Sequence, residues 1–289
     1  MTTTSSVRSA RFARLVAAGV TAAALLALAP VPSAHARPPL GDTVCTGPRA
    51  DAAALQQEIA AHNAKPHVFE LPREQAGFDA YNAEADALDA RAAAIDARLT
   101  SCLTAAYKLS GPSTGPGIPA AMPATLPSLV KRAHTGAPSR QEEIEELISV
   151  FDDAAQEYDD AWTDQVLQNK EQPEVGDSDP AFEDREIGAD DSGEPQVTPD
   201  YVIPLSDVLE MPKFLQLSPE SMWMVTMSPI NRQWISDQAV LAKNSPSVAA
   251  FTGVDDDWLQ AQAKLADAVR QQLQDAIDIL AESDQDQQQ

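Results

Sequence analysis

Two cysteines, Cys45 and Cys102, flank two segments with helical patterns, and they constrain the fold more than any other feature. Residues 49–64 and 73–107 are Ala-rich, with apolar residues at helical spacing. The link KPHVFELP contains two prolines and is expected to be extended. The first helix and the link lead outward for about 24 Å and about 26 Å, and the second helix returns about 45 Å to Cys102. The sequence therefore predicts a helical hairpin whose cysteines meet.

The first 36 residues have the layout of a secretory signal peptide. Three arginines precede an apolar run of 15 residues, which is shorter than the roughly 20 residues of a membrane-spanning helix. The cleavage site consists of Ala34 and Ala36, with Arg37 as the first mature residue. We therefore expect a secreted or extracytoplasmic protein that does not associate with the membrane after cleavage.

Export favours a disulfide between Cys45 and Cys102, because exported chains meet an oxidising environment. The bond would close a loop of about 57 residues and contribute on the order of 4 kcal/mol by constraining the unfolded chain. Free thiols and pairing between chains are the alternatives. His62 and His67 lie between the cysteines and could bind a metal with Glu58 or Glu70, but capping and packing at a helix end are the simpler roles.

The chain is strongly acidic, with 20 basic and 44 acidic residues and a formal net charge of −24. Such a charge disfavours nucleic acid and anionic lipid as general partners, and it leaves a protein partner open. No nucleophile elbow, phosphate-binding loop or zinc-protease motif is present. The sequence predicts no cofactor, and it implies a divalent metal only if the chain is a nuclease.

The expected fold is mainly α. The hairpin domain covers residues 37–109, and a Pro/Gly-rich linker follows over residues 110–138. An amphipathic helix over residues 139–170 has an acidic outer face and an apolar stripe that needs a partner, most simply the hairpin. Residues 171–199 are acidic and read as a disordered linker, and residues 200–289 form a small α-rich module with a short β element.

Three helices are expected in the C-terminal module after the short run YVIPL. The first begins near Ser218, with proline at its first position. The second covers residues 237–243. The third is a long helix that Asp255 caps. Its apolar stripe consists of Trp258, Leu265, Val269, Leu273, Ile277 and Leu280.

The run DYVIPL at Asp200 resembles the first strand of HNH nucleases, which has a histidine where this chain has Tyr201. Asn231, Ile235 and Lys243 follow at the intervals of that family. The segments SPINRQWIS and FTGVDDDW, and the hairpin sequence IAAHNAKPHVFELP with AYNAEADALDAR, also resemble secreted actinobacterial polymorphic-toxin-like proteins. The resemblance implies Asp200, Tyr201, Asn231 and Lys243 as candidate catalytic residues.

Two departures from the HNH pattern bear on activity. Tyr201 replaces the general base, and the ordinary pKa of tyrosine, about 10, makes it a poor base at neutral pH. Val240 stands at the position of a metal ligand. Asp200 and Asp207 could bind a metal, but they do not restore the base. No histidine follows His134.

Three functions are therefore in competition. The first is an exported, non-catalytic interaction protein with a degenerate nuclease-like module. The second is a metal-dependent nuclease toxin with a non-standard site. The third is a cell-envelope scaffold of self-associating helices.

Overall fold

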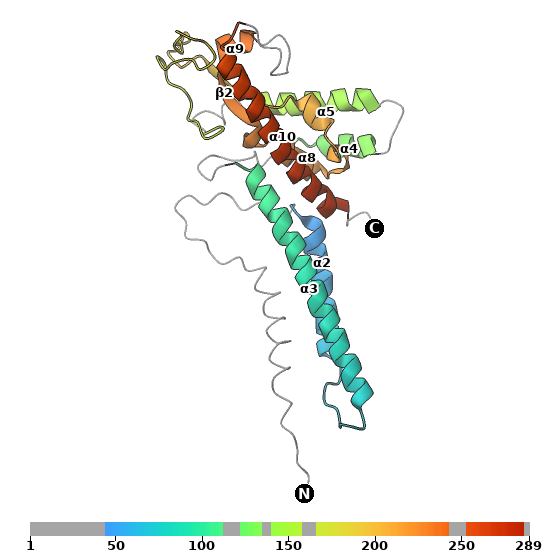
Figure 1. Cartoon of the computed structure of the whole chain (residues 1–289). Helices are drawn as coiled ribbons and strands as arrows, with labels where there is room; N and C mark the ends of the chain where they lie inside the picture. Colours follow the sequence, from blue (N-terminus) through green and yellow to red (C-terminus); the bar gives the residue numbers. More distant parts are fainter. Residues whose placement is uncertain (1–43, 112–121, 135–139, 158–165, 243–252, 286–289) are drawn as a thin grey trace. The chain divides into compact units, whose positions relative to one another are not determined.

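The computed structural model describes residues 44–111, 122–134, 140–157, 166–242 and 253–285. The predicted signal peptide, its cleavage site and Lys243 lie outside these residues. Within the described ranges the chain is mainly helical, as predicted, with one small antiparallel pair of strands (Figure 1). No helix in these ranges combines the length and the apolarity that a membrane span requires. The chain divides into two compact units, one of residues 45–101 and one that begins at residue 102.

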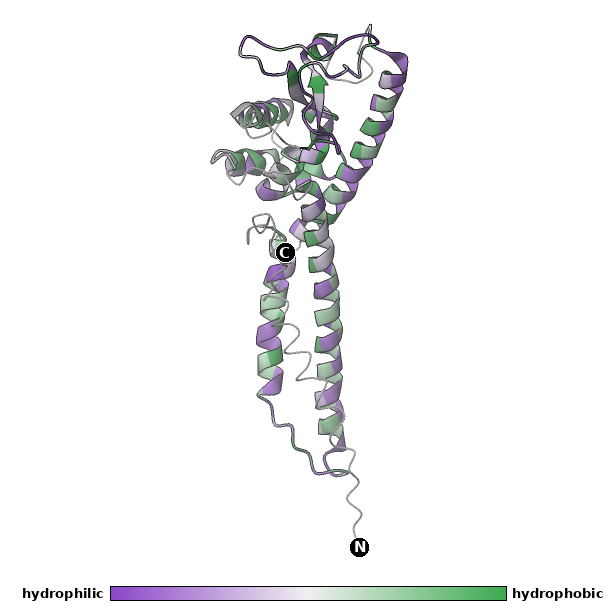
Figure 2. Cartoon of the chain, turned by 90° about the vertical axis from the view of Figure 1, so that its left-hand side faces the viewer, coloured by the Kyte–Doolittle hydropathy of each residue, from purple (hydrophilic) through white to green (hydrophobic). Residues whose placement is uncertain are grey.

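The first unit is the predicted hairpin. Helices α2 (Thr46–Asn63) and α3 (Gln75–Leu109) run antiparallel, and a disulfide joins Cys45 to Cys102, which confirms the predicted fold class and the pairing (Figure 1). The seam between the helices is narrow and buries Leu55, Ala85 and Leu88. Hydrophilic residues recur along the whole length of both helices (Figure 2). The disulfide suggests an oxidising, extracytoplasmic environment.

The second unit holds the main apolar core. It begins with the last turns of α3, continues through α4 (Leu126–His134) and α5 (Arg140–Glu157), and ends with α10 (Asp256–Gln285). Short elements lie between α5 and α10: β1 (Val197–Tyr201), α7 (Leu205–Leu209), η2 (Phe214–Gln216), α8 (Pro219–Thr226), η3 (Pro229–Asn231), β2 (Arg232–Ser236) and α9 (Asp237–Ala242). The largest fully buried side chains are Leu109, Leu126, Leu147, Phe151, Leu167, Ile203, Leu209, Phe214, Leu217, Met222 and Met227.

The helices predicted for the C-terminal module are present. Ser218 caps α8 by accepting a hydrogen bond from the Ser221 amide, and Pro219 is the first helical residue. Asp255 caps α10 by accepting from the Trp258 amide at 2.9 Å. On α10, the predicted apolar stripe is buried from Val269 to Leu280, where it covers the core.

Helix α4 lies in the segment that the sequence interpretation assigned to a linker. Its buried residues Leu126, Leu129 and Val130 form one apolar face. This face packs against α5, so the apolar stripe of α5 finds its partner in α4, α7 and the Trp223 ring of α8. The predicted helix does not extend to residue 170, because Leu167 and Lys170 pair in a tight turn; residues 158–165 lie outside the described ranges.

The acidic segment 171–199, interpreted from sequence as a disordered linker, has a defined loop structure. Main-chain hydrogen bonds close it from Gly176 to Ile187 and from Gly188 to Gln196. Ile187 and Ala181 are buried, and Ala181 belongs to an apolar cluster with Ile235 and Ala239. A few apolar anchors and many main-chain bonds therefore hold a segment whose composition resembles that of a disordered one.

Candidate functional site

The β1–β2 pair brings together most of the residues that the HNH resemblance singled out. Tyr201 pairs with Arg232, and Asp200 pairs with Gln233. Asn231 directly precedes β2, and its side chain is fully buried. The strands therefore place Asp200, Tyr201 and Asn231 at one end of the two-stranded sheet.

The Asn231 side chain is hydrogen-bonded to the main chain of Ile203 through both of its polar atoms. Its Oδ1 accepts a hydrogen bond from the Ile203 amide at 2.8 Å, and its Nδ2 donates to the Ile203 carbonyl at 2.9 Å. The Val202 amide donates to the Asn231 carbonyl at 3.0 Å. Asn231 thus extends the pairing of the strands by one residue and fixes the turn before α7.

Tyr201 lies beneath a buried arginine. The guanidinium carbon of Arg232 is 3.5 Å from the centre of the Tyr201 ring, and Nη1 donates to the Pro199 carbonyl at 3.3 Å. Asp152 of α5 lies close enough to Arg232 for their charges to interact. Burial raises the pKa of Asp152, Arg232 partly offsets that rise, and Asp153 adds to it. The stack is a cation–π contact inside the core, where it orders β1 against β2.

The other candidates do not complete a metal site. Val240 packs against the cluster of Ala181, Ile235 and Ala239. Asp207 is exposed and pairs with Arg270 of α10 at 3.6 Å. Among the described residues, no group of three or more histidine, cysteine or acidic side chains could hold a metal ion. With Asn231 bound to Ile203 and an apolar residue at position 240, the residues present do not fit the metal of an HNH nuclease.

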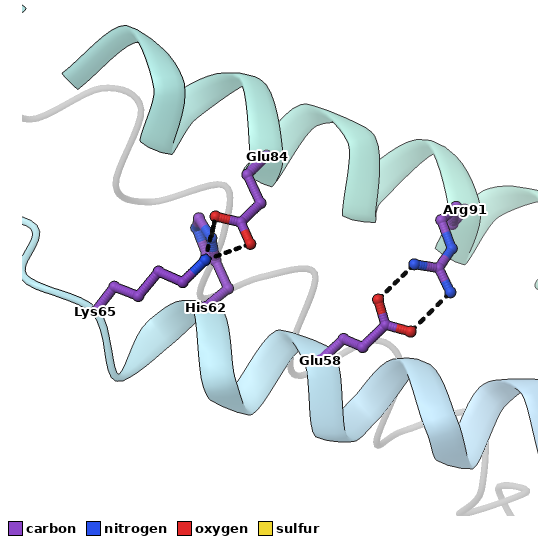
Figure 3. A network of polar contacts seen from close by, with 5 residues as sticks. All are labelled: Glu58, His62, Lys65, Glu84 and Arg91. Carbon is purple, nitrogen blue, oxygen red and sulfur yellow. Dashed lines mark hydrogen bonds and ion pairs between the residues drawn. The ribbon is translucent and has the colours of Figure 1, made fainter. Parts of the chain in front are cut away.

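The hairpin contains a regular set of interhelical ion pairs that the sequence interpretation missed. Arg98 binds Asp51 at 2.9 Å, and Arg91 donates to Glu58 from Nη1 at 2.5 Å and from Nη2 at 2.9 Å (Figure 3). Lys65 holds both oxygens of Glu84 at 2.5 and 2.6 Å. From one pair to the next, the first partner lies seven residues later in the chain and the α3 partner seven residues earlier; Asp51 and Glu58 are on α2, and Lys65 lies just beyond its end. This is the heptad spacing of an antiparallel coiled coil, and those charges were readable from the sequence.

The ion pairs shift the pKa values of their members. The hydrogen bonds from Arg91 lower the pKa of Glu58, and the same contact raises the pKa of Arg91. Hydrogen bonds from Lys65 and then His62 lower the pKa of Glu84. These groups are exposed, so they fix the register of the two helices more than they stabilise them.

His62 is a seam residue. Its side chain is fully buried, its ring centre is 4.1 Å from that of Tyr81, and Nδ1 is 3.1 Å from a Glu84 oxygen. His67, in contrast, lies exposed in the link, with Nδ1 3.2 Å from the Lys65 carbonyl. Glu58, once a possible ligand, is bound to Arg91. The two histidines therefore have separate surroundings.

The link between the hairpin helices exposes apolar side chains. Val68 is 79% exposed and Leu71 is 47% exposed. Phe69, between them, is half-buried, and its ring centre lies 6.0 Å from those of Phe78 and Tyr81 on α3. The alternation of apolarity in KPHVFELP predicted an extended link but not that Val68 faces solvent.

Comparison with known proteins found no matching family model, no similar curated protein and no similar solved structure.

Proposed function

We propose that the protein is an exported, non-catalytic interaction protein, in which a nuclease-like C-terminal framework serves structure and a disulfide-closed hairpin serves binding. The observation that carries the proposal is the bonding of Asn231. The Asn231 side chain is fully buried and binds the Ile203 main chain through both its oxygen and its nitrogen, so it presents no amide to solvent where a water molecule or a metal ion would be held. The relationship to polymorphic-toxin-like proteins is part of the same proposal.

Two further observations support a binding role. The hairpin is held at one end by the Cys45–Cys102 bond and along its length by ion pairs, so it is a stiff element. Its link presents Val68 and Leu71 to solvent. Exposed aliphatic side chains on a pre-organised element lower the entropic cost of binding a partner.

A nuclease assay tests the proposal against the nuclease alternative. The mature chain, residues 37–289, would be incubated with plasmid DNA and with RNA in the presence of Mg²⁺, Mn²⁺ or Zn²⁺. We expect no cleavage above that of a protein-free control. Metal-dependent cleavage that disappears in both Asp200→Asn and Tyr201→Phe would contradict the proposal, because each variant keeps the size of the side chain while removing its chemistry. An Arg73→Gln variant, changed on the hairpin alone, is the matched control and should behave like the unchanged chain.

A further inference from the structure

Helix α2 lacks the features that start a helix on its own. Its N-cap residue is Cys45, which has a positive φ of 57°, and within the described chain its side chain makes no capping hydrogen bond. No acidic residue stands in the first turn, and Gly47 there has a low helix propensity. A left-handed backbone is itself unfavourable for a residue with a side chain. The bond to Cys102 therefore fixes the start of α2.

The contacts that hold α2 along the seam are few. Beyond its first turn, Leu55 and His62 are the residues of α2 that are buried. His62 is a costly residue to bury, because Nε2 has no hydrogen-bond partner among the described residues. The ion pairs from α2 and the link to α3 are exposed, so each contributes little. Packing of this size does little to hold a helix of 18 residues in place.

Helix α3, in contrast, is anchored beyond the disulfide. Its last turns bury Ala105, Ala106 and Leu109. The Leu109 carbonyl accepts a hydrogen bond from the Ser228 hydroxyl, and these residues belong to the second unit. Loss of the disulfide therefore affects α2 first and leaves the end of α3 in place.

Both cysteines are closed to solvent in the folded hairpin, since Cys45 is 3% exposed and Cys102 is 1% exposed. Thiol–disulfide exchange requires a thiolate to reach a sulfur atom directly. The bond can therefore be made while α2 is away from α3, and it is shielded once α2 is docked. Burial of the sulfurs thus favours closure of the hairpin over its reopening.

We propose that Cys45 and Cys102 form a one-way oxidative latch, in which α2 is released from α3 while both cysteines are thiols, and formation of the bond docks α2 and shields both sulfurs. The oxidant is a disulfide. One cysteine thiolate attacks a sulfur of that disulfide and displaces a thiolate, and the second cysteine thiolate attacks the resulting mixed disulfide and displaces the other. Two electrons pass to the oxidant, which leaves as two thiols that carry the two protons of the cysteines.

The latch determines when the apolar face of α3 is covered. In the closed hairpin, α2 covers Ala85 and Leu88. In the dithiol chain this face is bare, and it is covered only after oxidation. The closed hairpin is therefore a property of the chain in an oxidising compartment. This inference goes beyond the proposed function, and neither depends on the other.

Amide hydrogen exchange in the mature chain, residues 37–289, tests the latch. The oxidised chain is compared with the chain that has been reduced in urea and refolded with a phosphine present, and with the double variant Cys45→Ser, Cys102→Ser. Closing a loop of about 57 residues corresponds to a factor of roughly a thousand in the docking equilibrium, and strain lowers that factor. We expect exchange in α2 to be faster by about a hundredfold or more in both comparison chains, and exchange in α10 to change by less than about twofold.

A substitute bridge separates covalent closure from the chemistry of the native sulfurs. In the double serine variant, Asp51→Cys and Arg98→Cys place two new thiols at facing positions, since the native side chains lie 2.9 Å apart. A short bismaleimide joins these thiols in one sample, and in the matched control each thiol is capped separately. We expect the bridged chain to recover most of the protection of α2 and the capped chain to recover none.

The rate of reduction tests the one-way character. Glutathione should reduce the bond in the folded chain about tenfold or more slowly than it reduces the same bond in the chain unfolded in urea. Glutathione disulfide should convert the folded dithiol chain to the internal disulfide, with the mixed disulfide present only in passing.

Each of four results would overturn the latch. They are unchanged exchange in α2 after reduction, joint loss of protection in α2 and α10, equal exchange in the bridged and capped chains, and equal rates of reduction in the folded and unfolded chains. Plasmid cleavage by the mature chain would contradict the proposed function and leave the latch standing.

Discussion

At the scale of single residues, side-chain amides and carboxylates in the second unit complete main-chain bonding. Asn231 supplies both an acceptor and a donor to Ile203, where the strand pair ends and no main-chain partner remains. Asp284, near the end of α10, accepts from the Ser218 amide at 2.7 Å and so binds the first turn of α8. Both contacts are buried, which makes each a sensitive point for stability.

We predict that Asn231→Ala lowers the free energy of unfolding by about 2–4 kcal/mol, because it leaves the buried amide and carbonyl of Ile203 without partners. Urea unfolding followed by tryptophan fluorescence would measure the change. Gln272→Ala on the exposed face of α10 is a matched amide control, with an expected change within about 0.5 kcal/mol. An equally small change for Asn231→Ala would show that the amide is not structural.

We predict that Asp284→Asn raises the unfolding temperature at pH 7. Burial raises the pKa of Asp284 in the folded state, so the stabilising contribution of this group is complete at pH values below its unfolded pKa. That contribution is lost as the pH rises through the folded pKa, and the ionised carboxylate then bears the desolvation cost. Asparagine keeps an acceptor for the Ser218 amide without the charge, for a gain on the order of 2 °C.

Thermal scans of both chains between pH 3 and pH 7 would check the effect of Asp284→Asn. The difference between the two chains should shrink as the pH falls. A difference that grows towards low pH would mean that the ionised carboxylate stabilises the contact with α8. Gln272→Ala serves again as the control. Gln274→Ala would not, because the Gln274 side chain donates to the Pro212 carbonyl.

At the scale of elements, the hairpin is defined by register more than by a large core. Leu55, Ala85 and Leu88 are the buried apolar residues of the seam, which makes a small core, and the ion pairs are exposed. The pairs nevertheless recur at seven-residue spacing in both arms of the hairpin, so a slip of one arm along the other would break all of these contacts together. Specific alignment thus comes from charges that add little stability one by one.

Charge reversal tests the role of the pairs. We predict that Arg91→Glu destabilises the hairpin, because it places two acidic groups at a cross-helix contact, and that the swap of Glu58→Arg with Arg91→Glu restores most of the loss. Amide exchange in α2 would report the effect, and it should weaken at about 0.5 M NaCl. Equal amide exchange in the unchanged chain, the single variant and the double variant would show that this ion pair does not set the register of the two helices.

The pH dependence of the same pair follows from the lowered pKa of Glu58. Its contribution is present above the pKa that the group has in the unfolded chain, and it is lost as the pH falls through the lowered, folded-state value. The difference between Arg91→Glu and the unchanged chain should therefore narrow in acid.

Elements with strong periodicity were predictable from sequence, and elements held by sparse contacts were not. The hairpin, α8 and α10 follow from apolar spacing and capping residues such as Ser218 and Asp255. Helix α4 was hidden because prolines and glycines surround its three apolar residues. The acidic loop was missed because Ala181 and Ile187 are too few to give a pattern, and the main-chain bonds that fix it leave no compositional signal.

Part of the candidate site could likewise be predicted from the sequence, and part could not. The strand pairing of Tyr201 with Arg232 agrees with the β-like run that the sequence indicated. The roles of the side chains depend on contacts across some 28 residues or more of chain, as between Ile203 and Asn231. Spacing within a motif carries no information on whether an amide faces solvent or a neighbouring main chain.

At the scale of the whole molecule, the net charge and the ion pairs formed within one chain argue against the scaffold alternative. The net charge of −24 makes copies repel one another. The heptad charges of α2 and α3 are matched within one chain, so the hairpin does not need a second chain to satisfy them. We predict that the mature chain is a monomer by light scattering at high concentration and at moderate salt. A stable dimer or larger assembly would favour the scaffold.

The matched spacing of the hairpin also limits how its length can change. Removing seven residues from α2 alone would bring acids opposite acids or leave charges unmatched, and it would separate Cys45 from Cys102. Removing seven from α2 and seven from the facing part of α3 would keep every remaining pair and the cysteine closure. The length of the hairpin can therefore change only in steps of seven residues, with both arms lengthened or shortened together.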